Sequence, residues 1–382
     1  MLNLWDIFQK IETRINAALS GKYWIWKAVA CAILLSSLFY VIPNLVHFLA
    51  RYRGFWLYTK VHTAQQVTEA GYLTQYWDFI KEQAADPLKE RHYLDPTGHE
   101  ANTTFRFWMP FLMKLAGGNL FIYLFYQLLG GVLQMYLTVK LAYALLQNKA
   151  AALSFATAIA GIYFGNAFYF EVRGYGDSWV FLAMTMAIYF RQPTLIFLAT
   201  QIIFWTDERG IINLVFIILW WLLDKIEPFD LKKVILKPQI FIIGVSLIIH
   251  FAIRILLEQK YHLTVPGRED AGSFGISVLK FTYGWFGSVV WNGYEGFIAL
   301  LVLGAYLFCT KKQKIYSFLL FASLAGSWLV SFMVYDCMRS ITFTGVVLFI
   351  LLRTIVRYVE PAGIRLMLFV IAIINLLAPS FY

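Results

Sequence analysis

The chain has 382 residues and a formal net charge of +10, and 60% of its residues are hydrophobic while only 14% are charged. Soluble domains carry about 25% charged residues and could not cover this much apolar surface, so the composition excludes a soluble globular protein. It predicts an all-α, polytopic integral membrane protein that forms a single transmembrane domain over residues 1–382 and has no nucleic-acid partner. Three scattered cysteines provide no disulfide framework.

The first segment, residues 1–22, is predicted to be an amphipathic helix that lies in the membrane interface. One helical face carries apolar side chains, and the opposite face carries charges. The apolar positions are Leu4, Phe8, Ile11, Ile15 and Leu19, and the charged ones are Asp6, Lys10, Glu12 and Arg14.

Apolar segments along the rest of the chain predict about eleven transmembrane helices. They cover 25–49, 119–147, 150–170, 177–190, 194–206, 210–223, 238–257, 295–309, 315–335, 340–352 and 366–380. The three pieces between 177 and 223 are only about 20 Å long at a helical rise of 1.5 Å per residue. Helices this short are expected to border a recessed cavity that contains water.

Two longer segments interrupt the apolar pattern, at 50–118 and 258–294, and both are predicted to be extracytoplasmic loops. The short connections on the other side are rich in lysine and arginine, as at 224–237 and 311–314. Because cations favour the cytoplasmic side, the N-terminus is predicted to be cytoplasmic. The expected location is the bacterial inner membrane.

Three predicted outer turns each combine acids with an arginine. They carry Glu171, Arg173 and Asp177 in the first turn, Asp207, Glu208 and Arg209 in the second, and Asp336 with Arg339 in the third. Charged residues near the membrane usually face a cavity and pair with one another. A single turn of this kind is typical of a solvated surface, whereas three on one side predict a shared site.

The loop at 50–118 adds further polar candidates, namely Asp95, His99, Glu100 and Arg106. Residues 105–115 are predicted to form an aromatic helix in the membrane interface that carries Arg106. A guanidinium at that position could bind a phosphate through two parallel hydrogen bonds. The alternative for His99 is an ordinary exposed loop residue.

The layout resembles the GT-C class of membrane glycosyltransferases. The resemblance lies in a long first outer loop, the stretch HEANTTFRFWMP at 99–110, the hairpins RGYGDSW at 173–179 and TDERGIINL at 206–214, and DCMRS at 336–340. It implies a GT-C-like fold, a polyprenyl-phosphate-linked sugar as donor, membrane lipids as surroundings, and an acceptor glycan, lipid or protein. No nucleotide-binding motif is present in the sequence, which favours a substrate delivered from the membrane.

The resemblance leaves the catalytic base open, because the class usually has an acid at the very start of the first outer loop, whereas the first acid here is Glu69. Candidates for the base are Asp95, Glu100, Asp177, Asp207 and Glu208, with Asp207 preferred because an arginine is expected to hold Glu208. Substrate-binding candidates are Arg106, Arg173, Arg209, Arg339, His99, Glu100, Glu171 and Asp336.

No cofactor is required by these patterns, although the clustered acids would permit a divalent cation. Three other functions remain open: a transporter or flippase of lipid-linked glycans, a polymerase of such glycans, and a scaffold without enzymatic activity. A transporter would favour related halves and broken helices near the middle of the membrane. The sequence has no evident internal repeat.

Overall fold

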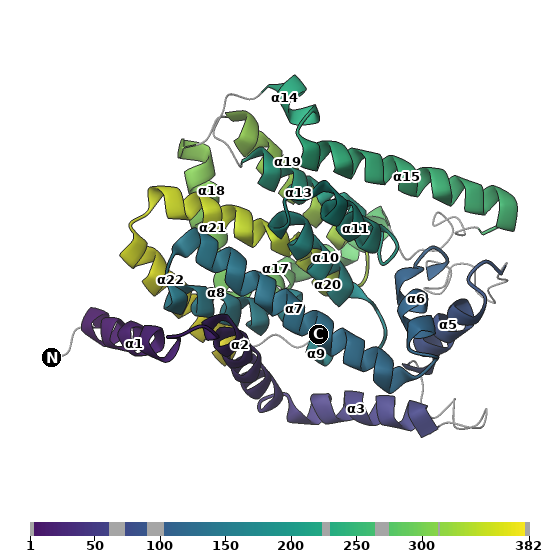
Figure 1. Cartoon of the computed structure of the whole chain (residues 1–382), viewed down its shortest axis with the longest axis horizontal. Coiled ribbons are helices and arrows are strands. Elements are labelled where there is room, and N and C mark those ends of the chain that lie inside the picture. The colour runs from purple at the N-terminus through teal and green to yellow at the C-terminus, as the bar shows by residue number, and fades with distance from the viewer. Residues whose placement is uncertain are drawn as a thin grey trace.

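The computed structural model describes residues 4–60, 73–89, 103–223, 230–263, 275–311 and 314–378. Within these ranges the regular elements are helices and no strand occurs (Figure 1). Six of the described helices are long and apolar enough to cross a membrane, or seven if one bent pair is counted as a span. These features agree with the all-α, polytopic membrane protein expected from composition, while the figure of about eleven spans stays a prediction.

The N-terminal segment forms helix α1 (Leu4–Ala18), as predicted. Phe8 is buried, and Glu12 forms an ion pair of 2.7 Å with Arg365 and accepts a hydrogen bond of 2.9 Å from Asn148. The helix is therefore attached to the bundle by polar contacts as well as by its apolar face. It lies at the opposite end of the molecule from α5 (Leu73–Ala85) and α6 (Trp108–Leu115) (Figure 1).

The interior of the bundle contains several helices that end within it. Helices α8 (Lys149–Gly161) and α9 (Tyr163–Phe170) meet at a bend of 62°. Gly165 allows this bend, because a Cβ atom there would lie 2.1 Å from the carbonyl oxygen of Ile159. The surrounding helices are α2 (Trp24–Val41), α7 (Leu120–Leu146), α21 (Val347–Tyr358) and α22 (Pro361–Leu377).

The three short apolar segments predicted between 177 and 223 are short helices in the structure. They are α10 (Asp177–Tyr189), α11 (Pro193–Phe204) and the pair α12 (Arg209–Ile212) and α13 (Leu214–Leu222). Proline at the first position of α11 suits a helix start, because the missing N–H has no helical acceptor there. The Asp207 turn thus joins two short helices, as the sequence predicts.

The segment at 50–118 contains more helix than a loop would. The apolar segment 25–49 is divided at Pro43 into α2 and a second helix, α3 (Leu45–Lys60), which extends well past residue 50. The predicted helix at 105–115 is shorter than expected, because the backbone N–H of Trp108 donates to the carbonyl of Trp205 at 2.8 Å. Arg106 therefore lies in a turn before α6 and not on a helix.

The second predicted loop, 258–294, is also largely helical where it is described. Helix α15 (Pro238–Tyr261) extends into it, and a helical run from Ile276 to Lys311 forms its second half. This run consists of α16 (Ile276–Thr282), η3 (Tyr283–Trp285), α17 (Phe286–Tyr294), η4 (Glu295–Phe297) and α18 (Ile298–Lys311). The glycines and aromatic residues of this segment are typical of a loop, but in the structure the segment is helical.

The remaining described elements complete the bundle. They are α14 (Leu231–Ile235), α19 (Lys314–Phe332), α20 (Cys337–Ile341) and η5 (Thr342–Val346). Helix α15 packs mainly against α11 and extends along one edge of the molecule towards the end that carries α5 and α6 (Figure 1).

Candidate functional site

The three turns that combine acids with arginine converge on one buried ion-pair network. Asp177 begins α10 directly after Gly176, whose φ of 78° is readily adopted by glycine. Asp207 lies between α11 and α12, and Arg339 lies on α20. The side chains of the three turns thus lie together in space, as the sequence predicts, while their role as a functional site stays a prediction.

Asp177 is the centre of this network. Its carboxylate is fully buried and accepts hydrogen bonds of 2.6 and 3.2 Å from Arg339 and of 3.2 Å from Arg209. The hydroxyl of Tyr163 donates to it at 3.1 Å. With these donors around it, Asp177 is positioned to hold two guanidinium groups in place.

Asp207 is the second fully buried acid. It accepts hydrogen bonds of 2.9 Å from the side chain of Arg209 and forms an ion pair of 3.0 Å with Arg106. Burial alone would raise the pKa of the Asp207 carboxyl, but Arg106 and Arg209 outweigh it and hold that pKa well below its usual range. Asp207 is therefore a stable anion and an intrinsically weak base.

Glu208 occupies the more open side of the same turn. Its side chain is 24% exposed, whereas that of Asp207 is fully buried, and its oxygen lies 3.4 Å from a nitrogen of Arg106. The sequence argument preferred Asp207 on the expectation that Arg209 or Arg173 holds Glu208. Arg209 instead binds Asp207 and Asp177, and Arg173 binds Glu171, so the arginine that contacts Glu208 is Arg106.

Two further ion pairs border the network. Arg173 makes paired hydrogen bonds with Glu171, and Arg339 forms an ion pair of 2.8 Å with Asp336, three residues away. The guanidinium groups of Arg173 and Arg339 lie 4.7 and 3.7 Å from the centre of the Tyr175 ring. All four arginines that the sequence indicated therefore already have carboxylate partners.

Helix α5, which the sequence analysis did not identify, braces this region. The indole N–H of Trp77 donates to the carbonyl of Val172 at 3.0 Å, and the amide of Gln83 donates to the carbonyl of Thr104 at 2.9 Å. These bonds fix the turn before α10 and the turn before α6 relative to each other. The apolar residues Leu73, Tyr76, Trp77 and Ile80 have the spacing of one helical face, and this was the sequence signal for the packing.

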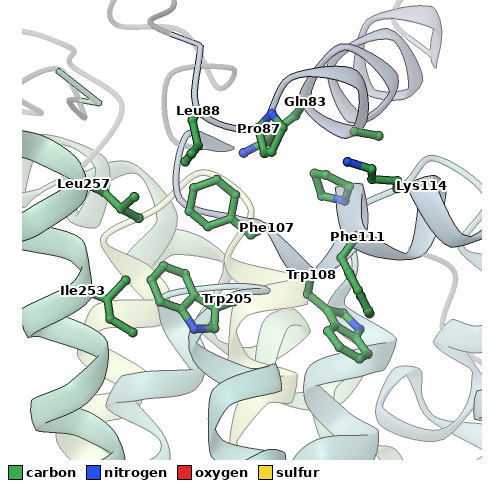
Figure 2. Close-up of a pocket in the computed structure, with 12 residues that line it drawn as sticks. Gln83, Pro87, Leu88, Phe107, Trp108, Phe111, Lys114, Trp205, Ile253 and Leu257 are labelled. Carbon is green, nitrogen blue, oxygen red and sulfur yellow. The ribbon is translucent and has the colours of Figure 1, made fainter. Parts of the chain in front are cut away.

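An apolar cleft of about 560 Å³ opens beside the charged network. Figure 2 shows the rings of Phe107, Trp108, Phe111 and Trp205 around it, with Lys114 at its rim. The remaining wall comes from α5 and the segment after it and from Ile253 and Leu257 on α15. The sequence indicated the aromatic residues, but the contribution of α15 could not be anticipated because it is distant in the chain.

Arg106 lies where the charged network and the apolar cleft approach each other. It lines a small cavity of about 30 Å³ together with Thr103 and Tyr175, and this cavity shares Gln83 and Pro110 with the cleft. The Nε atom of Arg106 is buried and has no hydrogen-bond partner. A buried donor without a partner is costly, which makes this atom a candidate contact for a ligand.

The remaining sequence candidates Asp95, His99 and Glu100 lie outside the described residues. Within the described ranges, no group of three or more histidine, cysteine, aspartate or glutamate side chains could hold a metal ion. The divalent cation stays a prediction. Comparison of the chain with protein-family models, curated proteins and solved structures gives no match.

Proposed function

We propose that this protein is a membrane glycosyltransferase that moves a sugar from a polyprenyl-phosphate-type lipid to an acceptor glycan, lipid or protein at the extracytoplasmic face. The observation that carries the proposal is the position of Arg106, between an apolar cleft and a network of buried carboxylates and guanidiniums. An amphiphile with an anionic head and an apolar chain fits such a boundary, because its head would contact the guanidinium of Arg106 and its chain would contact the apolar side chains of the cleft.

In this proposal the apolar chain of the donor occupies the cleft lined by Phe107, Phe111 and Trp205. Its phosphate lies at Arg106, whose buried Nε atom has no partner in the protein. Lys114 at the rim adds a second cation. Donors aimed at the phosphate stabilise the negative charge that develops there when the sugar leaves.

Glu208 is the proposed general base. It is partly exposed and adjoins Arg106, so an acceptor hydroxyl could approach it beside the donor phosphate. The bond from the sugar to the phosphate oxygen breaks, the acceptor oxygen forms the new bond, and the acceptor proton passes to the Glu208 carboxylate. Asp207 and Asp177 are too deeply buried for this step and instead keep the arginines in position.

The experiment that tests the phosphate site replaces Arg106 with lysine and with alanine. Lysine keeps the charge but loses the planar fork, and the loss of charge-assisted hydrogen bonds worth about 1.5–3 kcal/mol predicts donor affinity about 10–100-fold weaker. The matched control is Arg357, an exposed arginine near the end of α21, replaced in the same two ways. Unchanged donor affinity in both Arg106 variants would remove that residue from the site.

A second candidate function is a transporter or flippase of lipid-linked glycans. The observation that favours it is the 62° break between α8 and α9, since transporters use broken helices around their substrate site. An assay in sealed proteoliposomes that contain a lipid-linked sugar distinguishes the two functions. A transferase produces a glycosylated acceptor, whereas a flippase changes the leaflet of the lipid and leaves its sugar attached.

A further inference from the structure

Trp205 joins the apolar cleft to the turn that carries Glu208. Its indole ring lines the cleft, and Glu208 follows three residues later in the chain. Its backbone carbonyl accepts the hydrogen bond of 2.8 Å from the N–H of Trp108 at the start of α6, and its ring centre lies 5.4 Å from that of Phe107. The position of Trp205 therefore affects both the cleft and the segment that carries Arg106.

A chain of hydrogen bonds between α11 and α15 fixes the orientation of this indole. The indole N–H of Trp205 donates to the side-chain oxygen of Gln201 at 2.9 Å. The amide nitrogen of Gln201 donates to the hydroxyl and the carbonyl of Ser246 at 2.7 and 3.1 Å. The hydroxyls of Ser246 and Thr200 are both buried and lie 2.6 Å apart, and that of Thr200 donates to the carbonyl of Phe197 at 2.8 Å.

This chain of hydrogen bonds has one consistent direction. An indole N–H can only donate, so it requires the oxygen of the Gln201 amide, and the amide nitrogen must then point towards Ser246. Because the Thr200 hydroxyl donates to a carbonyl of its own helix, the Ser246 hydroxyl is the donor in their contact. An apolar side chain at position 201 would pack between the helices but would not hold the indole in this orientation.

His250 contacts the same ring from one turn further along α15. It is fully buried, and its ring centre lies 4.4 Å from that of Trp205 at an angle of 63°. Neither ring nitrogen of His250 has a hydrogen-bond partner among the described residues, so it supports the indole as an aromatic ring. Ser246, His250, Ile253 and Leu257 have the spacing of one helical face, and the last two line the cleft. One face of α15 thus supports Trp205 and provides part of the cleft wall.

We propose that Gln201 is a positioning residue for the lipid donor, because it holds the Trp205 indole in the wall of the cleft and so joins binding of the apolar chain to the placement of Arg106 and Glu208. This inference rests on the proposed function, since it takes the apolar chain of the donor as the occupant of the cleft. A precise binding site needs side chains whose conformations are fixed by neighbouring hydrogen bonds. Gln201 does not line the cleft itself, so it acts on the chain through Trp205.

The first test measures binding of two ligands to the purified protein in detergent, a long-chain polyprenyl phosphate and a water-soluble short-chain analogue with the same head group. Gln201→Leu removes the hydrogen bonds of the amide and should weaken binding of the long-chain ligand about 10-fold, with binding of the short-chain ligand unchanged. Ser246→Ala leaves Gln201 in place without its hydroxyl partner and should have a smaller effect in the same direction.

The matched control is Gln239→Leu, the same substitution at the opposite end of α15. The Gln239 amide donates to the carbonyl of Arg191 at 3.2 Å, away from the cleft. This variant should bind both ligands like the wild type.

Fluorine NMR of the protein labelled with fluorotryptophan distinguishes positioning from a loss of folding. The resonance of Trp205 is assigned by its absence in the Trp205→Phe variant. In the wild type it should be a single line that shifts when the long-chain phosphate is added. In Gln201→Leu it should be displaced and broadened, while the resonances of tryptophans remote from the cleft stay in place. An unchanged Trp205 resonance in this variant would contradict the proposed role of Gln201.

The binding results separate this inference from the proposed function. If Gln201→Leu and Ser246→Ala keep the wild-type preference for the long-chain ligand, or weaken both ligands equally, the inference is overturned and the proposed function is unaffected. If the wild type itself does not prefer the long-chain ligand, the apolar cleft does not hold the donor chain, and both fail. Where Gln201→Leu does not fold, the milder Ser246→Ala variant decides between these outcomes.

Discussion

Arg339 and Asp177 are joined by two hydrogen bonds, of 2.6 and 3.2 Å, across 162 residues of sequence. Both side chains are almost completely buried, at 5% and 0% exposure. This contact connects α20 to the start of α10 and therefore ties the C-terminal third of the chain to the hairpins that carry Asp207. The network is thus a structural element of the bundle as well as a candidate site.

Removal of one partner from this buried pair should be strongly destabilising. In the Asp177→Asn variant, Arg339 and Arg209 lose their shared buried carboxylate, and removing one partner of a buried ion pair typically costs about 3–5 kcal/mol. The matched control is Asp336→Asn, which removes another carboxylate from the same Arg339 at a site that is 45% exposed. The control should change stability by at most about 1 kcal/mol. Equal Tm losses in the two variants would contradict this assignment.

Substitution of the two acids in the 206–210 turn should have different effects, one on the transfer rate and the other on stability. Glu208→Gln should fold with a Tm close to the wild-type value, because its side chain is partly exposed, and should lose about 10²–10⁴-fold in transfer rate. Asp207→Asn should instead lower the Tm, because it removes the buried carboxylate that Arg106 and Arg209 share. Full transfer activity in Glu208→Gln would exclude that residue as the base and direct attention to Asp95 and Glu100.

Asp207 also predicts a distinct dependence of stability on pH. Its folded pKa is held below the unfolded value of about 3.9, so its contribution to stability is present above that pH and is lost as the pH falls below it. The Tm difference between the wild type and Asp207→Asn should be constant from pH 7 to pH 5. Below about pH 4, the difference in free energy of unfolding between the two proteins should decrease by up to about 1.4 kcal/mol per pH unit. The Tm difference should narrow accordingly. A constant difference down to pH 3 would show that Asp207 does not have this low pKa.

The apolar cleft predicts a selective effect on the lipid part of the donor. Phe111 is half-exposed and lines the cleft, so Phe111→Asp should place a charge in the path of an apolar chain at little cost to folding. We expect weaker binding of a long-chain polyprenyl phosphate and unchanged binding of a water-soluble short-chain analogue. Phe121→Asp, at a comparably exposed position at the start of α7, is the control. If both variants bind the two ligands alike, the cleft does not hold the chain.

The sequence alone was sufficient to predict a helical membrane protein. An apolar composition and long apolar segments are typical of a chain that is surrounded by lipid. It also indicated that Glu171, Asp177, Asp207 and Asp336 lie in turns together with arginines. Local spacing revealed the pair of Asp336 with Arg339, since residues three apart in a helix are neighbours.

The sequence could not reveal which acid binds which arginine across the bundle. Arg209 contacts Asp177 as well as its neighbour Asp207, and this depends on how α10 packs against α11. The same limitation applies to the cleft, where α15 approaches α6 from a distant part of the chain. Residues 276–294 belong to the segment that was predicted to be a loop, because glycine is common in loops. In the structure these residues are helical.

The most direct test of the central claim is a transfer assay with the purified protein in proteoliposomes. Polyprenyl-phosphate donors that carry a set of radiolabelled hexoses and pentoses are supplied with membrane-derived acceptors, and label in the acceptor is measured for the wild type and for Glu208→Gln. A glycosyltransferase that uses Glu208 as its base predicts label transfer by the wild type from at least one donor and a loss of about 10²-fold or more in the variant. Transfer at equal rates by both proteins, or no transfer from any donor although wild-type protein moves the intact lipid between leaflets, would contradict it.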